Sequence, residues 1–427
     1  MSAFPVPRCA DSFEHLLARM HEEGAHAIAL REGLKYRSAF QPIYSLSHGR
    51  VVGHEALLRA YTDAGAFVPP PEVFATDSFH ELLWRDRTAR VVHMVNYFRQ
   101  APNDQWVFVN VNPDVFAHGM GGPADGFTRR LHEHYAFDAR RVVIEVTEEA
   151  TQDAERFAEA IARARRAGCL IAIDDFGAGH SNFDRVWRWR PEIVKLDRSL
   201  VARASSDLQA RRVVVQMVSL LHECGALVLM EGVETTTEAV IALEADVDLV
   251  QGYLFGRPQA ELASPTRVCI ELEQAWQQFD LGWRADKTLY QDQTTPYLNG
   301  IRHASVLLEG GRTMADACKP FLSLAHAEVC YLLGPDGRQI GGHLWTGTRE
   351  GNHAFAPLNE SEGARWSRRP YFRRAVETPG KLQITRPYRT LHGGGLCVTV
   401  SIAFHRLNEE GQREMFVVCG DVRWPAD

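Results

Sequence analysis

The sequence predicts an α/β protein in which a closed (β/α)8 barrel is followed by a smaller α+β domain. Its 427 residues exceed the usual size of a single domain, and the 45% of hydrophobic residues are enough for a buried core. Between about residues 36 and 260, short apolar runs alternate with segments whose apolar residues recur at helical spacing. Eight such runs separated by helices predict a barrel of parallel strands, with a doubly wound open sheet as the main competing arrangement.

The eight predicted strands are short, rich in Val, Ile and Leu, and mostly without alternation, as expected of strands that are buried on both faces. They lie at Ser38–Ile43, Val51–Leu58, Trp106–Val111, Arg141–Val146, Leu170–Ile173, Ile193–Leu196, Leu227–Met230 and Asp248–Val250. Helices are predicted between them, for example over Asp153–Ala167 and Arg211–Cys224. Gly168 and Gly225 follow these two helices, at the position where a glycine commonly ends a helix.

The chain changes character after the predicted barrel. Residues 263–320 are polar and compatible with helix, and a connecting helix is predicted near Arg267–Phe279. Beyond them, alternating apolar runs and Gly-rich turns predict an antiparallel sheet, with a helix near Arg369–Glu377. The strands of this sheet are predicted at Val329–Leu333, Gln339–Leu344, Leu382–Arg386, Leu396–Phe404 and Glu414–Val422. We therefore divide the chain into a barrel at 1–262, a helical linker at 263–320 and a smaller domain at 321–427.

Bulk properties narrow the class of protein. The formal net charge of −7 argues against broad binding to DNA or to anionic membranes, although a few local cations could still hold a nucleotide. The eight cysteines are scattered without a CxxC pair, which argues against a zinc site and a disulfide framework and fits reduced thiols. Met1–Ala10 lacks the pattern of a signal peptide, and no apolar run is long enough to cross a bilayer. These patterns predict a cytoplasmic protein that binds neither DNA nor a membrane.

Polar side chains recur at the carboxyl ends of the predicted strands. The residues at or just after these ends are Glu55, Asn110, Glu145, Asp174, Asp175, Lys195, Asp197, Glu231 and Gln251. In a barrel these ends share one rim, which is where the active sites of such barrels lie. A single acidic residue at a strand end is more often a helix cap or part of a surface ion pair, but recurrence on successive strands favours a shared site.

Carboxylates gathered at one rim need positive charge between them. Like charges at close range raise each other's pKa and resist burial, and hard divalent cations remove that repulsion. Carboxylate and amide oxygens are the ligands that Mg²⁺ and Mn²⁺ prefer, and the adjacent Asp174 and Asp175 are suited to bridge two ions. Lys195 alone would more often be a surface lysine, but beside an acidic rim it is suited to orient an attacking water and to stabilise a phosphorane charge. The rim therefore predicts a two-metal site that hydrolyses a phosphodiester.

The same segments resemble the EAL-domain phosphodiesterases, which cleave cyclic-di-GMP to linear pGpG. The resemblance covers roughly residues 36–260 and implies a TIM-like barrel with one reversed strand. The matching motifs are Gln41-Pro42-Ile43, Glu55-Ala56-Leu57-Leu58-Arg59, Asn110, Glu145 with Glu148, Asp174-Asp175-Phe176-Gly177, Lys195-Leu196-Asp197, Glu231-Gly232-Val233-Glu234, and Gln251-Gly252-Tyr253 with Pro258. Two departures bear on the rate of turnover. Ala60 stands where the family often has an aromatic residue, and Ala178 and His180 replace the usual Thr and Tyr in the loop at 176–182.

The resemblance also implies a role for each residue of the site. The implied ligands of two Mg²⁺ or Mn²⁺ ions are Glu55, Asn110, Glu145, Asp174 and Asp175. The residues implied to act in catalysis are Glu55, Asp175, Lys195 and Glu231. Those implied to hold the substrate are Gln41, Leu57, Arg59, Asp197, Glu234 and Gln251, and Glu148 is implied to brace the loop after Asp175. Ca²⁺ is expected to inhibit, because its larger and looser shell fits an octahedral site poorly.

The smaller domain resembles a PAS- or Cache-type sensory module in its layout, which includes Arg369-Pro370-Tyr371-Phe372. The resemblance implies a small-molecule signal bound there, with a purely structural dimerisation role as the alternative, and a homodimer is expected. For the barrel, the sequence favours an active cyclic-di-GMP phosphodiesterase, since receptors of this kind usually lose metal ligands and every ligand is present. A catalytically weak or inactive cyclic-di-GMP receptor is the alternative, and a metal hydrolase for another phosphate ester is a third.

Overall fold

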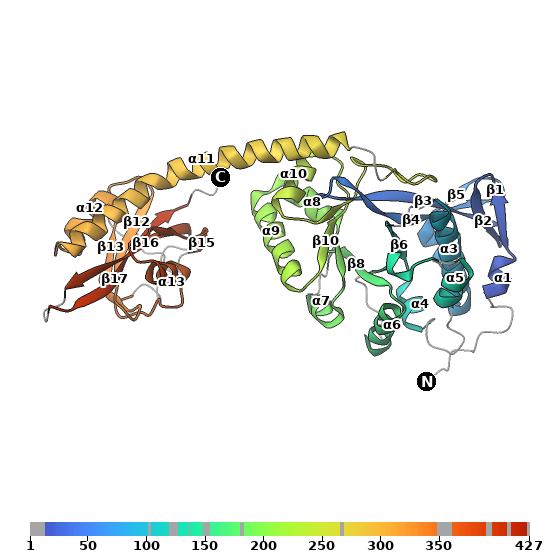
Figure 1. Ribbon diagram of the computed structural model, residues 1–427, viewed down its shortest axis with the longest axis horizontal. Helices are drawn as coiled ribbons and strands as arrows, with labels where there is room; N and C mark the ends of the chain where they lie inside the picture. The colour runs from blue at the N-terminus through green and yellow to red at the C-terminus, as the bar shows by residue number, and fades with distance from the viewer. Residues whose placement is uncertain are drawn as a thin grey trace. The chain divides into compact units, whose positions relative to one another are not determined.

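A computed structural model of the chain describes residues 13–100, 104–118, 127–135, 137–147, 154–179, 183–264, 269–347, 361–389, 395–407 and 411–424. The chain forms two compact units, Met1–Leu281 and Gly282–Asp427, joined within the long helix α11 (Ile270–Glu309) (Figure 1). The first unit contains the barrel, and the second contains a separate, smaller sheet.

Eight strands of the first unit close into a barrel. They are β3 (Leu34–Ser45), β4 (Arg50–Thr62), β6 (Trp106–Asn110), β7 (Val142–Thr147), β8 (Leu170–Phe176), β9 (Ile193–Leu196), β10 (Leu227–Met230) and β11 (Leu249–Val250). β4 pairs in parallel with β6, and each strand from β6 to β11 pairs in parallel with the next one along the chain. β3 pairs antiparallel with both β4 and β11. The predicted barrel with one reversed strand is confirmed, and the open sheet is not formed.

The interior of the barrel begins with a layer of apolar side chains. Each of seven strands contributes one residue, namely Ile43, Phe108, Val143, Ala172, Ile193, Leu229 and Leu249. The remaining strand, β4, contributes Gly53, where a Cβ would lie 2.9 Å from the carbonyl oxygen of Trp106. Side chains alternate along a strand, so the residue two positions further toward the carboxyl-end rim also points inward. This layer is the floor on which the rim residues stand.

Helices cover the outer face of the barrel (Figure 1). They are α3 (Phe79–Gln100), α4 (Pro113–His118), α5 (Phe127–Tyr135), α6 (Ala154–Arg166), α7 (Phe183–Trp189), α8 (Arg198–Ser206), α9 (Leu208–Glu223) and α10 (Thr236–Glu244). Apolar residues of these helices, such as Phe157, Val214 and Ile241, pack in one core with the outward residues of the strands. α6 and α9 confirm the two helices named from the sequence, and the glycines that follow them have positive φ, 99° at Gly168 and 86° at Gly225.

A small sheet extends the barrel beyond its wall. β2 pairs with the outer part of β3, β1 pairs with β2, and β5 pairs with the far end of β4. The elements of this extension are α1 (Phe13–Leu17), β1 (Met20–Glu23), β2 (His26–Arg31), β5 (Phe67–Val68) and α2 (Pro70–Phe74). The sequence did not predict it, because the outer parts of β3 and β4 mix polar and apolar residues and contain no continuous apolar run.

The second unit is built on an antiparallel sheet with the order β13-β12-β17-β16-β14, in which β15 also pairs with β16. Its elements are α12 (Met314–Leu322), β12 (Ala327–Leu333), β13 (Gln339–Trp345), α13 (Pro370–Glu377), β14 (Gln383–Ile384), β15 (Tyr388–Arg389), β16 (Leu396–Leu407) and β17 (Arg413–Arg423). One face of the sheet packs against α12 and the end of α11, and the other packs against α13. The predicted antiparallel sheet and its helix are confirmed.

The two units separate between Leu281 and Gly282, inside α11, whereas the sequence places a helical linker at 263–320. Ile301 of α11 and Phe321 of α12 are fully buried against the second sheet. These residues belong to a core, and helical character alone does not distinguish a core helix from a linker.

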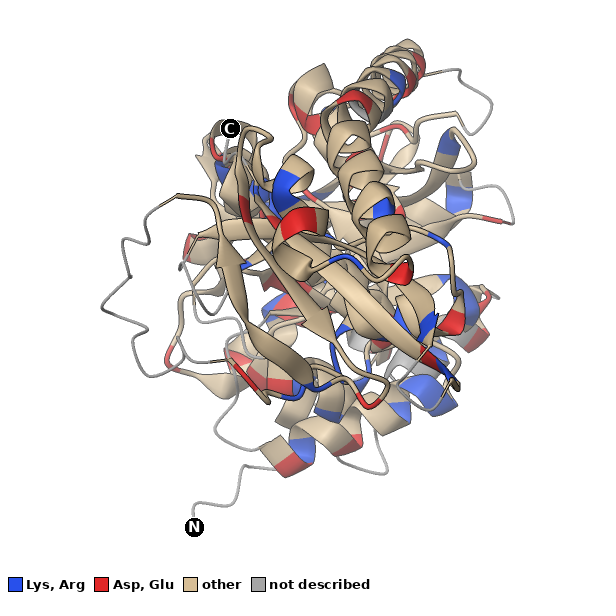
Figure 2. Cartoon of the chain, turned by 90° about the vertical axis from the view of Figure 1, so that its left-hand side faces the viewer, with Lys and Arg blue, Asp and Glu red and all other residues tan. Residues whose placement is uncertain are grey.

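Charged residues are distributed over both units. Figure 2 shows Lys and Arg mixed with Asp and Glu along helices and strands, so the net charge of −7 does not come from one acidic segment. Among the described residues, no helix is both long enough and apolar enough to span a membrane.

A carboxyl group is buried in the sheet of the second unit. Asp421 of β17 is 3% exposed, and its Oδ1 accepts hydrogen bonds from Thr399 Oγ1 at 2.7 Å and from the Tyr331 hydroxyl at 3.4 Å. Burial raises the pKa of Asp421 from an ordinary 3.8 to about 7. At a pH between these two pKa values, the Asp421 carboxyl is ionised in the unfolded chain but protonated in the folded protein.

We predict that Asp421 makes the second unit less stable as the pH rises from about 4 to about 7. Because its folded pKa exceeds its unfolded pKa, its contribution is fully present below the unfolded value and is lost through the folded value, a change on the order of 4 kcal/mol. Asp421→Asn should therefore leave stability almost unchanged at pH 4 and raise it at pH 8. Urea unfolding of the full chain at both pH values checks this, with the exposed Asp292→Asn in α11 as the control. An equal effect of Asp421→Asn at both pH values would contradict the prediction.

Candidate active site

On every strand of the barrel, the inward-pointing residue next to the apolar floor is polar or charged. Asn110, Glu145, Asp174, Lys195, Glu231 and Gln251 each follow a floor residue by two positions, Glu55 follows Gly53, and Gln41 precedes Ile43 on the reversed strand. The pocket at this rim has a volume of about 330 Å³ and is lined by Gln41, Glu55, Asp174, Asp175, Lys195, Asp197, Arg198, Glu231, Gly232, Glu234, Gln251, Gly252 and Tyr253. The predicted convergence of distant strand ends is therefore observed for most of the residues named from the sequence.

Lys195 lies at the centre of the acidic rim and is 1% exposed. Its Nζ is 2.6 Å from Glu145 Oε1 and 2.7 Å from Glu231 Oε1. It is also 3.0 Å from Asp174 Oδ1 and 3.8 Å from Glu55 Oε1. Burial by itself would lower the pKa of Lys195, but the surrounding carboxylates hold it well above its usual value. The lysine therefore stays charged and is the internal counterion of four carboxylates.

Burial raises the pKa of the carboxylates around Lys195. It raises the pKa of Glu145 and of Glu231 far above their usual value, and the charge of Lys195 only partly opposes this. Burial and the neighbouring Asp174 also raise the pKa of Asp175. The rim thus gathers more acidic groups than the single charge of Lys195 can neutralise, and a bound cation would offset the remaining charge.

Asp174 and Asp175 both line the pocket although they are consecutive residues of β8. Side chains of consecutive residues on a regular strand point to opposite faces. Asp175 has a positive φ of 55°, and the pairing of β8 with β9 shifts its register between Ile173 and Phe176. The break turns the second carboxylate toward the pocket, and the Asp175 N–H donates to Asp174 Oδ1 at 3.0 Å. Left-handed backbone costs a non-glycine residue about 1–2 kcal/mol, and at Asp175 this strain lies in a residue that lines the pocket.

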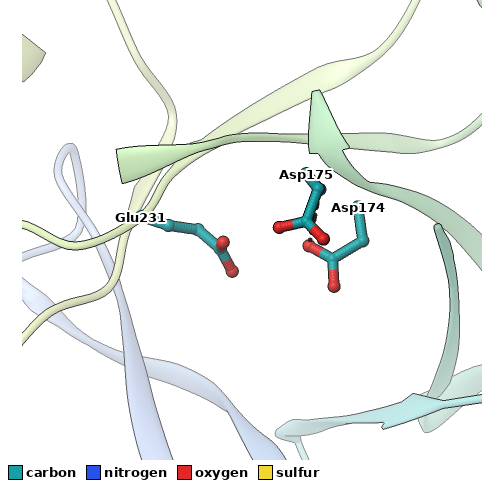
Figure 3. A group of neighbouring side chains, drawn as sticks. All are labelled: Asp174, Asp175 and Glu231. Carbon is teal, nitrogen blue, oxygen red and sulfur yellow. Dashed lines mark hydrogen bonds between the residues drawn. The ribbon is translucent and has the colours of Figure 1, made fainter. Parts of the chain in front are cut away.

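Asp174, Asp175 and Glu231 form a group that could hold a metal ion. One carboxylate oxygen of each lies within 4.8 Å of the others. Figure 3 shows Glu231 reaching from the loop after β10 toward the two aspartates at the end of β8. Oxygen donors of this kind are the ligands that hard divalent cations prefer.

Two amide side chains donate hydrogen bonds to Glu55, and a third amide side chain holds one of them. Asn110 Nδ2 donates to Glu55 Oε1 at 3.0 Å, and Gln251 Nε2 donates to Glu55 Oε2 at 2.7 Å. Gln251 Nε2 also donates to Gln41 Oε1 at 3.1 Å, and Gln41 Nε2 donates to the carbonyl oxygen of Gly256. Glu55 is thereby held on both oxygens by residues from two other strand ends, and Gln41 in turn holds Gln251.

Glu145 provides a test of whether the rim suits metal ions. Its two oxygens are buried, and within the described part of the chain their ion-pair partner is Lys195, which is shared with three other carboxylates. A buried carboxylate that shares its cation with other carboxylates is costly, and a further cation would offset that cost. Together with the neighbouring oxygen donors, Glu145 fits the set of ligands expected for a divalent ion.

The remaining residues named from the sequence differ in their relation to the pocket. Asp197 and Glu234 line it, and Asp197 also caps α8 by accepting a hydrogen bond from the Ser199 N–H at 2.9 Å. Leu57 and Arg59 lie further along β4 on the strand face that carries Glu55, and they are not among the residues that line the pocket. Glu148 and the loop residues His180, Ser181 and Asn182 lie outside the described residues.

The pocket contains residues that the sequence did not single out as site residues. Arg198, the first residue of α8, and Tyr253, after β11, both line it. The guanidinium of Arg257 lies 4.2 Å from the centre of the Tyr253 ring. In the sequence, the signal for Arg198 was that it directly follows the motif Lys195-Leu196-Asp197. The signal for Tyr253 was that it ends the motif Gln251-Gly252-Tyr253.

Two glycines let the loops of the rim pack without space for a side chain. A Cβ on Gly252 would lie 1.9 Å from the carbonyl oxygen of Val233, and the Val233 N–H donates to the carbonyl oxygen of Gln251 at 3.1 Å. Gly232 has a φ of 65°, and a Cβ there would lie 2.3 Å from the Cβ of Arg198. The loops that carry Glu231 and Gln251 therefore pack closely against each other, and the loop with Glu231 also packs against α8.

A family model of the EAL domain matches residues 26–258, which is more than half of the chain. The chain belongs to the EAL-domain family. Among curated EAL relatives, the cyclic di-GMP phosphodiesterase RocR of Pseudomonas aeruginosa is 27% identical over 241 residues, which are 53% of this chain and 58% of RocR. An uncharacterised protein of Azorhizobium caulinodans is 31% identical over 268 residues, which are 57% of this chain and 35% of that protein. The chain thus spans 35% and 58% of the length of these two relatives.

A solved structure extends the likeness beyond the EAL domain. The crystal structure of Bacillus subtilis YkuI, described as having an EAL domain in complex with substrate c-di-GMP and calcium, matches with a TM-score of 0.75 at 19% identity. The match covers 92% of this chain and 97% of YkuI. In sequence, YkuI is 23% identical over 343 residues, which are 78% of this chain and 82% of YkuI. At this identity the likeness shows a shared fold, and it reaches into both units.

We predict that Lys195→Met strongly destabilises the EAL domain in the absence of metal. Lys195 is the sole ion-pair partner of four carboxylates within the described residues, and loss of one partner from a buried ion pair costs about 3–5 kcal/mol. Excess Mn²⁺ should restore much of the loss, because a ligand that binds only the folded state stabilises it. Urea unfolding with EDTA and with Mn²⁺ checks this, with the exposed Lys319→Met in α12 as the control. If the variant without metal is as stable as the control, Lys195 is not the counterion that the geometry indicates.

Proposed function

We propose that this protein is a cyclic-di-GMP phosphodiesterase that opens one ester of the cyclic dinucleotide to give linear pGpG. The observation that carries the proposal is the contact of Lys195 with four carboxylates at the carboxyl-end rim of an EAL barrel. The name of RocR, a cyclic di-GMP phosphodiesterase, and the c-di-GMP bound to YkuI support the choice of substrate.

The proposed metal ligands are Glu55, Asn110, Glu145, Asp174 and Asp175, which would hold two Mg²⁺ or Mn²⁺ ions. Bound divalent ions lower the pKa of a water and neutralise phosphate charge. In this proposal, Glu231 and Lys195 position the attacking water. Glu231 orders the water, and Lys195 orients it and stabilises the charge that develops on the phosphate. Gln251 holds Glu55 in place through a hydrogen bond, and Gln41 accepts a hydrogen bond from the same Gln251 amide.

The substrate would be held around this centre. We assign Gln41, Leu57, Arg59, Asp197, Glu234 and Gln251 to substrate binding, and Glu148 to support of the loop after Asp175. The alternative, a receptor that binds cyclic-di-GMP without cleaving it, has less support, because the carboxylates of the rim are all retained and lie close together.

We assign a regulatory role to the second unit. Its antiparallel sheet, with α13 on one face and α12 and the end of α11 on the other, supports the resemblance to a PAS- or Cache-type module. In this proposal the unit binds a small-molecule signal, the protein acts in the cytoplasm as a homodimer, and α11 connects the sensor to the enzyme.

We predict that the full chain with Mg²⁺ or Mn²⁺ converts cyclic-di-GMP to pGpG and that Asp174→Ala abolishes this. Loss of a residue one step removed from a metal costs about 10–100-fold in activity, so loss of a direct ligand should cost more. Separation of the nucleotides by liquid chromatography measures the product, and circular dichroism verifies the fold. The exposed Asp280→Ala in α11 should retain full activity. Binding of the nucleotide without product would favour the receptor, and full activity of Asp174→Ala would exclude the metal assignment.

We predict that Ca²⁺ as the only divalent ion supports little or no turnover. Ca²⁺ takes six to eight ligands at longer distances than Mg²⁺, so it should bind the rim without holding water and phosphate in reactive positions. Initial rates with Mn²⁺ and increasing Ca²⁺ should fall, and binding of cyclic-di-GMP measured by calorimetry should persist in Ca²⁺. Equal rates in Ca²⁺ and Mn²⁺ would refute this account of the metal preference.

A further inference from the structure

We propose that Arg198 binds the second phosphate of cyclic-di-GMP, the one that is not cleaved, and so selects a substrate with two phosphodiesters. The inference rests on the proposed function, since it concerns the same pocket. Arg198 is not among the residues to which the family resemblance gave a role.

The backbone around Arg198 fixes where its side chain begins. Arg198 is the first residue of α8, and the side chain of Asp197 caps that helix. The loop after β10 turns at Gly232, whose position leaves no space for a Cβ because the Cβ of Arg198 is there. The side chain of Arg198 therefore starts next to Glu231, and this exposed residue lines the pocket.

Of the cationic residues that line the pocket, Arg198 is the one available to bind an anionic ligand. Of the described lining residues, two are cationic, Lys195 and Arg198. Lys195 is 1% exposed and already in contact with four carboxylates. Arg198 is exposed, and no hydrogen bond or ion pair engages its side chain within the described part of the chain. A guanidinium without a partner at the mouth of an acidic pocket is suited to an anionic group of the ligand.

The chemistry of the substrate provides that group. Two phosphodiesters close the ring of a cyclic dinucleotide on opposite sides, so when one is at the carboxylates of the rim, the other faces away from them. There it would meet Asp197 and Glu234, which also line the pocket and would repel it. Arginine binds phosphate through two parallel N–H donors and keeps its charge at every relevant pH, so Arg198 would offset that repulsion.

The test compares Arg198→Gln with the full unsubstituted chain in Mn²⁺, at low and at moderate salt. A hydrogen-bonded ionic contact at an exposed site should raise the KM for cyclic-di-GMP roughly tenfold, while kcat stays within about twofold. The salt dependence of KM should become weaker, because one phosphate contact is lost. Arg198→Lys should recover part of the affinity, and Arg203→Gln, an exposed arginine further along α8, should leave KM unchanged.

A substrate with a single phosphodiester separates binding from chemistry. Rates with bis(p-nitrophenyl) phosphate should be equal in Arg198→Gln and the unsubstituted protein, because this substrate has no second phosphate. An unchanged KM for cyclic-di-GMP overturns the proposal, and so does a raised KM with unaltered salt dependence, which would indicate contact with a neutral base. A matching loss on bis(p-nitrophenyl) phosphate also overturns it, because the effect would then act through Glu231.

A binding assay tests the role of Arg198 even if the protein does not hydrolyse cyclic-di-GMP. If the unsubstituted chain gives no pGpG, calorimetric binding of cyclic-di-GMP in Ca²⁺ replaces the kinetic assay. Arg198→Gln should then raise Kd roughly tenfold, with a weaker salt dependence than the unsubstituted protein. An equal Kd in both proteins would overturn the role of Arg198 whatever the protein does with the nucleotide.

Discussion

The ion pairs between Lys195 and the carboxylates of the rim are the interaction on which the rest of the site depends. Four acidic side chains at the ends of four strands would repel one another in a buried space, and Lys195 Nζ lies within 3.8 Å of an oxygen of each. The same groups that destabilise the barrel when unpaired are those that would bind metal ions. Stability of the rim and its chemistry are thus two consequences of one arrangement of charge.

The barrel makes this arrangement possible through the period of two in its strands. A floor of apolar residues fills the interior, and the next inward residue on each strand is polar or charged. The reversed strand β3 obeys the same rule in the opposite direction, because Gln41 precedes Ile43 instead of following it. A shift of one residue in any of these strands would exchange a rim residue for an outward apolar one, so the packing of the floor also sets the register of the site.

Most of the barrel could be predicted from the sequence because its strands are buried on both faces and appear as apolar runs. The convergence of Glu145, Asp174 and Lys195 follows from topology once these strands are placed. The contribution of Asp175 does not, because it depends on a positive φ and a shift in register that no pattern of residues signals. Arg198 was equally hidden, since its place in the pocket depends on the turn at Gly232 and on the packing of that loop against α8. Nor does the composition of the polar helical segment reveal that Phe321 belongs to the second core.

In the proposed two-metal site, the charges of the rim are consistent with two metal ions and with the role proposed for Arg198. Glu55, Glu145, Asp174, Asp175 and Glu231 are five carboxylates gathered around one ammonium group, so four negative charges are left when all are ionised. The two divalent ions of the proposed site would carry the same amount of positive charge, whereas one ion would leave the rim anionic. A substrate with two phosphates then adds two negative charges to a centre that is already neutral. Lys195 is shared among the carboxylates, and the uncommitted guanidinium of Arg198 is the positive group of the described pocket lining that remains for the phosphate outside the rim.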